Sequence, residues 1–135
     1  MSRRIVLVVD DHAVLRGLLK SLLRRWFPGV GVVEALDGET AVSLAAEMRP
    51  DVVIMDITLP GMNGIEATRL LKAGLPNTSV IMLSVHELDA YRRDAIAAGA
   101  DAYISKRHIH SALQGSLARI LASPLGSPMK REANT

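Results

Sequence analysis

The sequence of 135 residues contains no cysteine, which excludes both a disulfide framework and a metal site built on thiolates. Aromatic residues make up only 3% of the chain, so its core has to be built from Leu, Val, Ile, Ala and Met. No apolar run approaches the roughly 18 residues of a membrane span, and the run near the N-terminus is too short for a signal peptide. We therefore expect one domain, located in the cytoplasm and not associated with a membrane.

A strong charge of one sign is also lacking. Lysine and arginine number 16 and the acidic residues 14, which leaves a net charge of +2. That balance is too mild to indicate binding to nucleic acid or to a membrane surface. The proportions of apolar residues (49%) and charged residues (22%) are typical of a globular core. Function must therefore be sought in short motifs.

Short apolar runs alternate with segments of helical periodicity along the chain. Two runs, at 5–9 and 52–55, are continuously apolar, and a third, at 79–83, is apolar after Ser79. Such runs are typical of strands buried on both faces of a parallel sheet. Weaker strands are predicted at 31–35, at a sheet edge, and at 102–104. Helices are predicted near 15–26, 41–48, 65–72, 87–98 and 109–121, and the fourth should place Leu88, Tyr91 and Ala95 on its inner face. This alternation predicts an α/β fold with a doubly wound parallel sheet, helices on both faces and right-handed crossovers.

Polar residues directly follow four of these strands. They are Asp10 with Asp11, Asp56, Ser84 and Lys106. Because the carboxyl ends of parallel strands meet at one edge of the sheet, where open α/β sheets bind ligands, we expect these side chains to share a crevice.

The chemistry of this set indicates phosphoryl transfer. Three neighbouring carboxylates need a cation, and oxygen ligands of high charge suit Mg²⁺. Lys106 would neutralise one phosphoryl oxygen and Ser84 would donate a hydrogen bond to another. Asp56 is the candidate nucleophile, since carboxylates form phosphoryl intermediates.

Each residue taken alone has an ordinary structural explanation. An aspartate after a strand is more often a turn former, the pair Asp10-Asp11 can cap the first helix, and Lys106 can be a solvated charge. The joint placement at four strand ends favours a site. We interpret His12 as surface of the first helical turn, and the spacing of the remaining histidines does not indicate a zinc site.

Several motifs together resemble the receiver domain of bacterial two-component response regulators, most closely that of NarL/LuxR-type regulators. The resemblance covers residues 4 to about 122. The motifs are Val8-Val9-Asp10-Asp11-His12, Met55-Asp56, Leu59-Pro60-Gly61-Met62-Asn63-Gly64, Leu83-Ser84-Val85-His86, Gly99-Ala100-Asp101-Ala102-Tyr103 and Ser105-Lys106.

The resemblance implies a flavodoxin-like (βα)5 fold with strand order 2-1-3-4-5. Residues 1–122 would form the receiver domain, and 123–135 a disordered C-terminal tail. It implies that Asp56 takes a phosphoryl group from the phosphohistidine of a sensor histidine kinase or a phosphotransfer protein. Mg²⁺ would be held by Asp10, Asp11, Asp56 and the backbone carbonyl of Thr58.

The resemblance further implies that Lys106 and Ser84 bind phosphoryl oxygens and that Tyr103 changes rotamer with Ser84. The fourth helix, fifth strand and fifth helix would form the output face, through which the domain contacts a downstream protein or itself. Such a domain is a signalling phosphoacceptor and no enzyme beyond its own phosphorylation and dephosphorylation. Regulators of the NarL/LuxR type carry a helix-turn-helix, whereas only 123–135 follow here, so we expect no direct DNA binding.

Two features depart from the family pattern. Arg107 follows Lys106 where proline is common, so we expect a trans peptide there, and Val85 is bulkier than usual. Two other functions remain alternatives. An aspartyl phosphohydrolase would need an acid two residues after its nucleophile, where Thr58 stands. A flavin or nucleotide carrier would need a phosphate-cradling loop after the first strand, where Asp10-Asp11 would repel phosphate.

Overall fold

The computed structural model describes residues 3–122, so the predicted tail at 123–135 lies outside the described residues. Five parallel strands form one sheet in the order β2-β1-β3-β4-β5. This confirms the predicted doubly wound sheet and the edge position of the second strand. The strands are β1 (Ile5–Val9), β2 (Gly31–Ala35), β3 (Val52–Asp56), β4 (Ser79–Ser84) and β5 (Ala102–Ser105).

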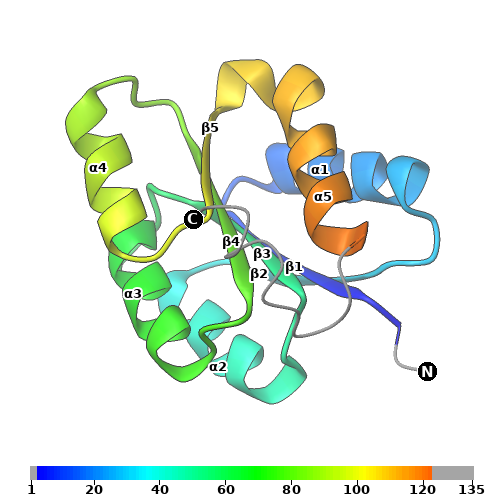
Figure 1. Ribbon diagram of the computed structural model, residues 1–135, viewed down its shortest axis with the longest axis horizontal. Helices are drawn as coiled ribbons and strands as arrows, with labels where there is room; N and C mark the ends of the chain where they lie inside the picture. The colour runs from blue at the N-terminus through cyan, green and yellow to red at the C-terminus, as the bar shows by residue number, and fades with distance from the viewer. Residues whose placement is uncertain (1–2, 123–135) are drawn as a thin grey trace.

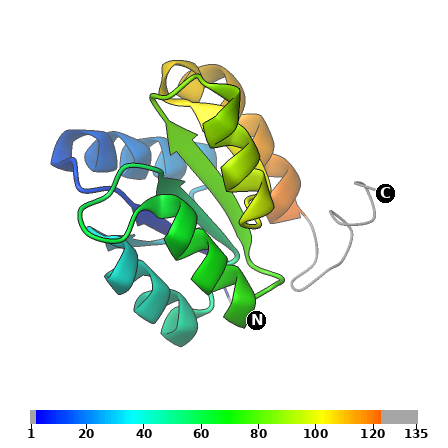
Figure 2. The same ribbon diagram turned by 90° about the vertical axis from the view of Figure 1, so that its left-hand side faces the viewer.

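Helices cover both faces of the sheet (Figures 1 and 2). Helices α1 and α5 lie on one face and α2, α3 and α4 on the other. No helix within residues 3–122 is long and apolar enough to cross a membrane. The helices are α1 (Ala13–Trp26), α2 (Gly38–Met48), α3 (Gly64–Gly74), α4 (Asp89–Ala97) and α5 (Gln114–Ala122).

The central strands bury both of their faces, which explains why their sequences are apolar without alternation. Every residue of β3 and β4 is buried. Successive side chains enter two separate cores, one under α2, α3 and α4 and the other under α1 and α5. The first core contains Leu7, Val53, Met55, Val80 and Met82 from the strands, and the second contains Val6, Val8, Ile54, Ile81 and Leu83.

Two details of the helices differ from the sequence prediction. Helix α4 begins at Asp89, and Leu88, expected on its inner face, is 68% exposed. Leu88 has an extended backbone (φ −74°, ψ 137°) and precedes the first turn, so the helical periodicity does not apply to it. The last helix is preceded by a 3-10 turn (Lys106–His108) and a π-helical turn (Ile109–Leu113). The peptide between Lys106 and Arg107 is trans, as expected.

The loop after β3 folds back over the end of its own strand. The N–H of Ile57 donates to the carbonyl of Leu83 at 3.0 Å, and the N–H of Gly64 donates to the carbonyl of Ile57 at 2.9 Å. The Asn63 side chain accepts a hydrogen bond from the N–H of Glu66 and so caps α3. This loop therefore has a defined path beside Asp56.

Gly64 is the point where this loop leaves no room for a side chain. A Cβ there would lie 2.9 Å from the Cα of Ile57 and closer still to the carbonyl oxygen of Asp56. We expect Gly64→Ala to lower the free energy of unfolding by about 1–3 kcal/mol, because the backbone around Asp56 has to shift.

Gly115→Ala is the matched control in urea denaturation. A Cβ at Gly115 meets nothing within 4 Å, and alanine in a helix is favoured over glycine by about 0.8–1.0 kcal/mol. The control should therefore be at least as stable as the parent. Equal stabilities for the two variants would show that the loop adapts to the extra methyl group.

Candidate functional site

Asp56 ends the central strand β3 and is almost fully buried, with 2% of its surface exposed. Its Oδ2 accepts a hydrogen bond from Lys106 Nζ at 2.9 Å, and its Oδ1 accepts one from the N–H of Thr58 at 3.1 Å. Lys106 lies in the turn that follows β5, two strands away from β3. Both carboxylate oxygens of Asp56 are therefore fixed by groups that follow strand ends.

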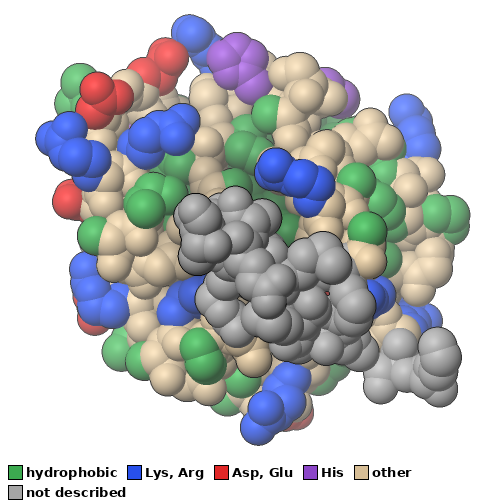
Figure 3. All heavy atoms as spheres, in the orientation of Figure 1, with side chains coloured by type: hydrophobic (Ala, Val, Ile, Leu, Met, Phe, Trp, Pro, Cys, Tyr) green, Lys and Arg blue, Asp and Glu red, His purple; other side chains and the backbone are tan. Residues whose placement is uncertain are grey.

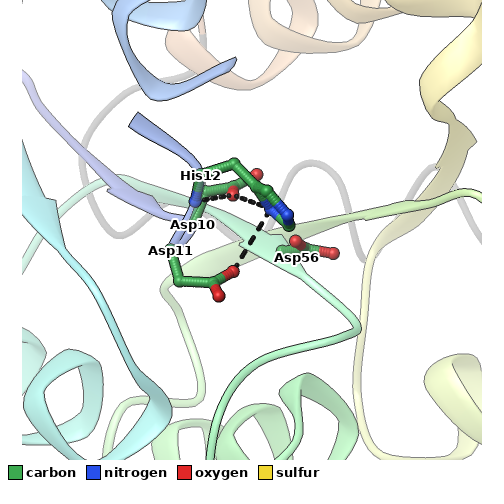
Figure 4. Close-up of side chains that lie close together, drawn as sticks. All are labelled: Asp10, Asp11, His12 and Asp56. Carbon is green, nitrogen blue, oxygen red and sulfur yellow. Dashed lines mark hydrogen bonds and ion pairs between the residues drawn. The ribbon is translucent and has the colours of Figure 1, made fainter. Parts of the chain in front are cut away.

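A pair of carboxylates, Asp10 and Asp11, follows β1 at the same edge of the sheet (Figure 4). Asp10 is buried and Asp11 is exposed. The ring Nδ1 of His12 lies 3.2 Å from Asp10 Oδ1 and 3.3 Å from Asp11 Oδ1. One ligand atom from each of Asp10, Asp11, His12 and Asp56 can be chosen so that all four lie within 4.8 Å of one another.

These residues fit a divalent cation for a second reason, besides the number of carboxylates that they bring together. One carboxylate oxygen has no hydrogen-bond partner. Asp10 Oδ2 is buried and has no hydrogen-bond donor, and Lys106 Nζ lies 3.6 Å away from it, beyond hydrogen-bond distance. An unsatisfied buried carboxylate oxygen is costly. One lysine also faces three carboxylates here. A hard cation with oxygen ligands, of which Mg²⁺ is an example, would satisfy this oxygen and balance the charge.

Burial raises the pKa of the Asp56 carboxyl above its ordinary value, and the neighbouring Asp10 charge acts in the same direction. The hydrogen bonds from Lys106 and from the N–H of Thr58 oppose this rise, but desolvation is the largest cause. The site thus holds its central carboxylate at a cost in the absence of a cation.

Ser84 ends β4, between the strands that lead to Asp56 and to Lys106. Leu83 pairs with Asp56 in the sheet, so Ser84 follows directly at the acidic edge. Its side chain is fully buried, and its Oγ accepts a hydrogen bond from the N–H of His86 at 2.8 Å. Tyr103, on β5, donates its hydroxyl to the carbonyl of His86 at 3.0 Å. Ser84 and Tyr103 therefore meet the same residue.

Two histidines lie beside the site, and one of them, His12, is closer to the carboxylates than we expected from sequence. His12, interpreted as helix surface, is the N-cap residue of α1, and its ring contacts both carboxylates. His86 Nε2 lies 3.4 Å from Thr58 Oγ1, beside the loop of Asp56. The position of His12 directly after the acidic pair was the available signal, and spacing rules for zinc do not use it.

The sequence profile described as "Response regulator receiver domain" matches residues 6–118. The chain belongs to the response regulator receiver family. Its fold is the flavodoxin-like fold of such receivers. Receiver domains typically accept a phosphoryl group, interact with histidine kinases or phosphotransfer proteins, and bind Mg²⁺ at an acidic pocket.

Individual relatives agree with this assignment. The response regulator GacA of Pseudomonas aeruginosa is 41% identical over 102 residues, which cover 75% of this chain and 47% of that protein. A two-component response regulator of the LuxR family from Aurantimonas is similar in structure, with 37% identity and a TM-score of 0.82 over 90% of this chain and 86% of that one.

A third relative contains a metal ion. The receiver domain of a sensor histidine kinase from Pseudomonas aeruginosa, crystallised with magnesium in its active-site cleft, has 30% identity and a TM-score of 0.80, covering 90% of this chain and all of that one.

The present chain spans about half the length of the regulators that it matches, 43% of DegU from Brevibacillus brevis and 47% of GacA.

Because the pKa of Asp56 is raised, its contribution to the stability of the receiver domain should fall as the pH rises. The folded state holds this proton to a higher pH than the unfolded chain does. The contribution of Asp56 to folding is therefore most favourable below the ordinary carboxyl pKa of about 3.9. It is lost as the pH rises from that value through the raised pKa.

Asp56→Asn removes this ionisation, so its stability relative to the parent should increase over the same pH interval. Urea unfolding from pH 4 to 7 in a chelator measures the difference. Asp94→Asn, at an exposed position of α4, is the control and should run parallel to the parent. If the free energies of unfolding of the parent and of Asp56→Asn differ by the same amount at every pH, the pKa of Asp56 is not raised.

Proposed function

We propose that this receiver domain, over residues 1–122, acts in the cytoplasm and takes a phosphoryl group from the phosphohistidine of a sensor histidine kinase or a phosphotransfer protein onto Asp56. The observation that carries the proposal is the position of the Asp56 carboxylate. It is buried at a strand end, bound to Lys106 at 2.9 Å and grouped with Asp10 and Asp11. Among the carboxylates of this cluster, Asp56 alone accepts a hydrogen bond from the lysine as well as from a backbone N–H.

The metal site in this proposal consists of Asp10, Asp11, Asp56 and the backbone carbonyl of Thr58. The donorless Oδ2 of Asp10 supports this set, because a cation would supply the partner that it lacks. When bound, Mg²⁺ would offset the charge of the carboxylates and of the incoming phosphoryl group. The ring of His12 lies against two of these carboxylates, those of Asp10 and Asp11.

In the transfer, a carboxylate oxygen of Asp56 forms a bond to phosphorus as the bond from phosphorus to the donor histidine nitrogen breaks. The electron pair of the broken bond stays on the imidazole, and Asp56 becomes an acyl phosphate. Lys106 donates to the Asp56 carboxylate before the transfer. After the transfer it neutralises a phosphoryl oxygen, and the Ser84 hydroxyl donates a hydrogen bond to another. The domain would catalyse only this reaction and its own dephosphorylation.

The proposed output face comprises α4, β5 and α5, and the described side chains give it a specific shape. A groove of about 470 Å³ lies beside Tyr103, between α4 and the turns that precede α5. Leu88 lines the groove and is 68% exposed. Figure 3 shows acidic and basic side chains near one another over α4, with histidine side chains at the upper edge of that face. Such a surface suits a downstream protein or a second receiver.

Phosphorylation of Asp56 is tested by intact mass after incubation with acetyl phosphate and Mg²⁺. We expect the parent to gain one phosphoryl group and Asp56→Asn to gain none, because the amide has no nucleophilic oxygen. Asp11→Ala should need more Mg²⁺ for the same labelling, whereas Lys106→Ala should keep metal binding and lose the switch.

The controls for this reaction are Asp94→Asn, which should label like the parent, and the parent in excess chelator, which should not label. Full labelling in chelator, or one phosphoryl group on Asp56→Asn, would refute the mechanism.

A separate prediction concerns the output face. If Ser84 moves toward a phosphoryl oxygen, the contacts of His86 and Tyr103 change, and the face around the groove changes with them. We expect phosphorylation to alter the sedimentation of the protein or its binding to a downstream partner. In Ser84→Ala, phosphorylation to the same labelled fraction, measured by intact mass, should change sedimentation or partner binding less than in the parent. Identical sedimentation and identical tyrosine spectra before and after full labelling would argue against this output route.

A further inference from the structure

His86 lies between the phosphoacceptor loop and α4 and contacts residues on four separate segments. Its ring Nε2 lies 3.4 Å from Thr58 Oγ1, and the ring stacks on that of Tyr91, with centroids 4.3 Å apart and planes 21° apart. Its backbone N–H donates to Ser84 Oγ, and its carbonyl accepts from the Tyr103 hydroxyl. One half-buried side chain and its own peptide groups thus join the loop after β3, the end of β4, α4 and β5.

The Thr58 end of this contact is close to the phosphoacceptor. The N–H of Thr58 donates to Asp56 Oδ1 at 3.1 Å, so any movement of that carboxylate oxygen acts on the Thr58 backbone. The hydroxyl of the same residue is the group that faces the His86 ring. Two contacts of Thr58 therefore link the carboxylate of Asp56 to the imidazole of His86.

At its other end, the His86 ring contacts a weakly anchored element, the helix α4, through Tyr91. Ala95 is the one fully buried residue of α4, and Tyr91 is half-buried against the core under α2, α3 and α4. An element with few buried contacts opens or shifts at low cost in free energy. A stacked aromatic pair stabilises its partners beyond the effect of the apolar area that it buries. The stack on His86 is thus a substantial part of what fixes the first turn of α4.

We propose that His86 is a positioning residue whose ring couples the state of the Asp56 loop to the position of α4, through Thr58 on one side and Tyr91 on the other. The coupling rests on the proposed phosphoacceptor role of Asp56, and it adds a second route to the one through Ser84 and Tyr103. The two routes differ in chemistry. The Ser84 and Tyr103 contacts use the backbone of residue 86, which any amino acid supplies, whereas the Thr58 contact needs the imidazole and the Tyr91 stack needs an aromatic ring.

Substitutions at this position separate the two contacts of the ring. His86→Phe keeps an aromatic ring for Tyr91 and removes the polar contact with Thr58. His86→Ala removes both contacts and leaves the backbone route. His110→Phe is the matched control, because His110 is exposed on the turn before α5.

The chain contains two tyrosines, and both contact His86. Labelling tyrosine rings with ¹³C therefore gives one NMR signal set on α4 and one on β5, with no other tyrosine to assign. The two routes are read separately in the same sample.

The first measurement needs no phosphorylation. Thr58→Val removes the hydroxyl that faces His86, and we expect it to shift the Tyr91 signals in the parent and in His110→Phe. The same substitution in the His86→Phe background should leave the Tyr91 signals unshifted. An equal Tyr91 shift in the two backgrounds, or no shift in the parent, would overturn the coupling. A reduced stability of His86→Ala does not affect this comparison, because His86→Phe retains the stack.

The second measurement uses protein labelled with acetyl phosphate and Mg²⁺, with the labelled fraction taken from intact mass. We expect both tyrosines to shift in the parent, and Tyr103 alone to shift in His86→Phe at the same labelled fraction. A full Tyr91 shift in labelled His86→Phe would overturn the coupling. If the mass shows no phosphoryl group on the parent, the proposed function fails, and the Thr58→Val measurement still decides the role of His86.

Discussion

The ion pair between Lys106 and Asp56 depends on every larger feature of this fold. The two residues are 50 positions apart in the chain, and their side chains meet at 2.9 Å because β3, β4 and β5 are parallel neighbours that end at the same edge. Ser84 ends the strand between them and so lies at the same place. Any change in strand order or direction would separate the carboxylate, the hydroxyl and the ammonium group.

The site is held together against its own electrostatics. Asp56 is buried with a raised pKa. Asp10 Oδ2 has no hydrogen-bond donor, which costs about 1–3 kcal/mol for a neutral group and more for a charged one. Each fully buried Val, Leu or Ile side chain contributes about 1.5–3 kcal/mol in the opposite direction, and β3 and β4 are buried along their whole lengths. The same apolar strands that present the charges at their ends therefore offset the cost of gathering them.

The sequence predicted the parts of the fold that depend on local pattern. Continuous apolar runs predicted the central strands. The polar residues that follow the strands were predicted to lie at the strand ends, as they do: Asp10, Asp11, Asp56, Ser84 and Lys106. The prediction that Leu88 lies on the inner face of α4 was wrong, because an extended residue before a helix does not follow helical spacing. The π-helical turn at Ile109–Leu113 was missed because its buried residues, Ile109 and Leu113, are also spaced as an α-helix would space them. The position of His12 depends on the direction of an N-cap side chain, which composition and periodicity do not encode.

Backbone and side-chain contacts around residue 86 differ in what a substitution does to them. Ser84 and Tyr103 bind the peptide groups of residue 86, so this link survives a change of side chain as long as the β4–α4 loop keeps its path. The ring contacts with Thr58 and Tyr91 require three particular side chains at once. A receiver with other residues at these positions would keep the first link and lose the second. The strength of the coupling between the phosphoacceptor and α4 can therefore vary while the acidic site itself remains unchanged.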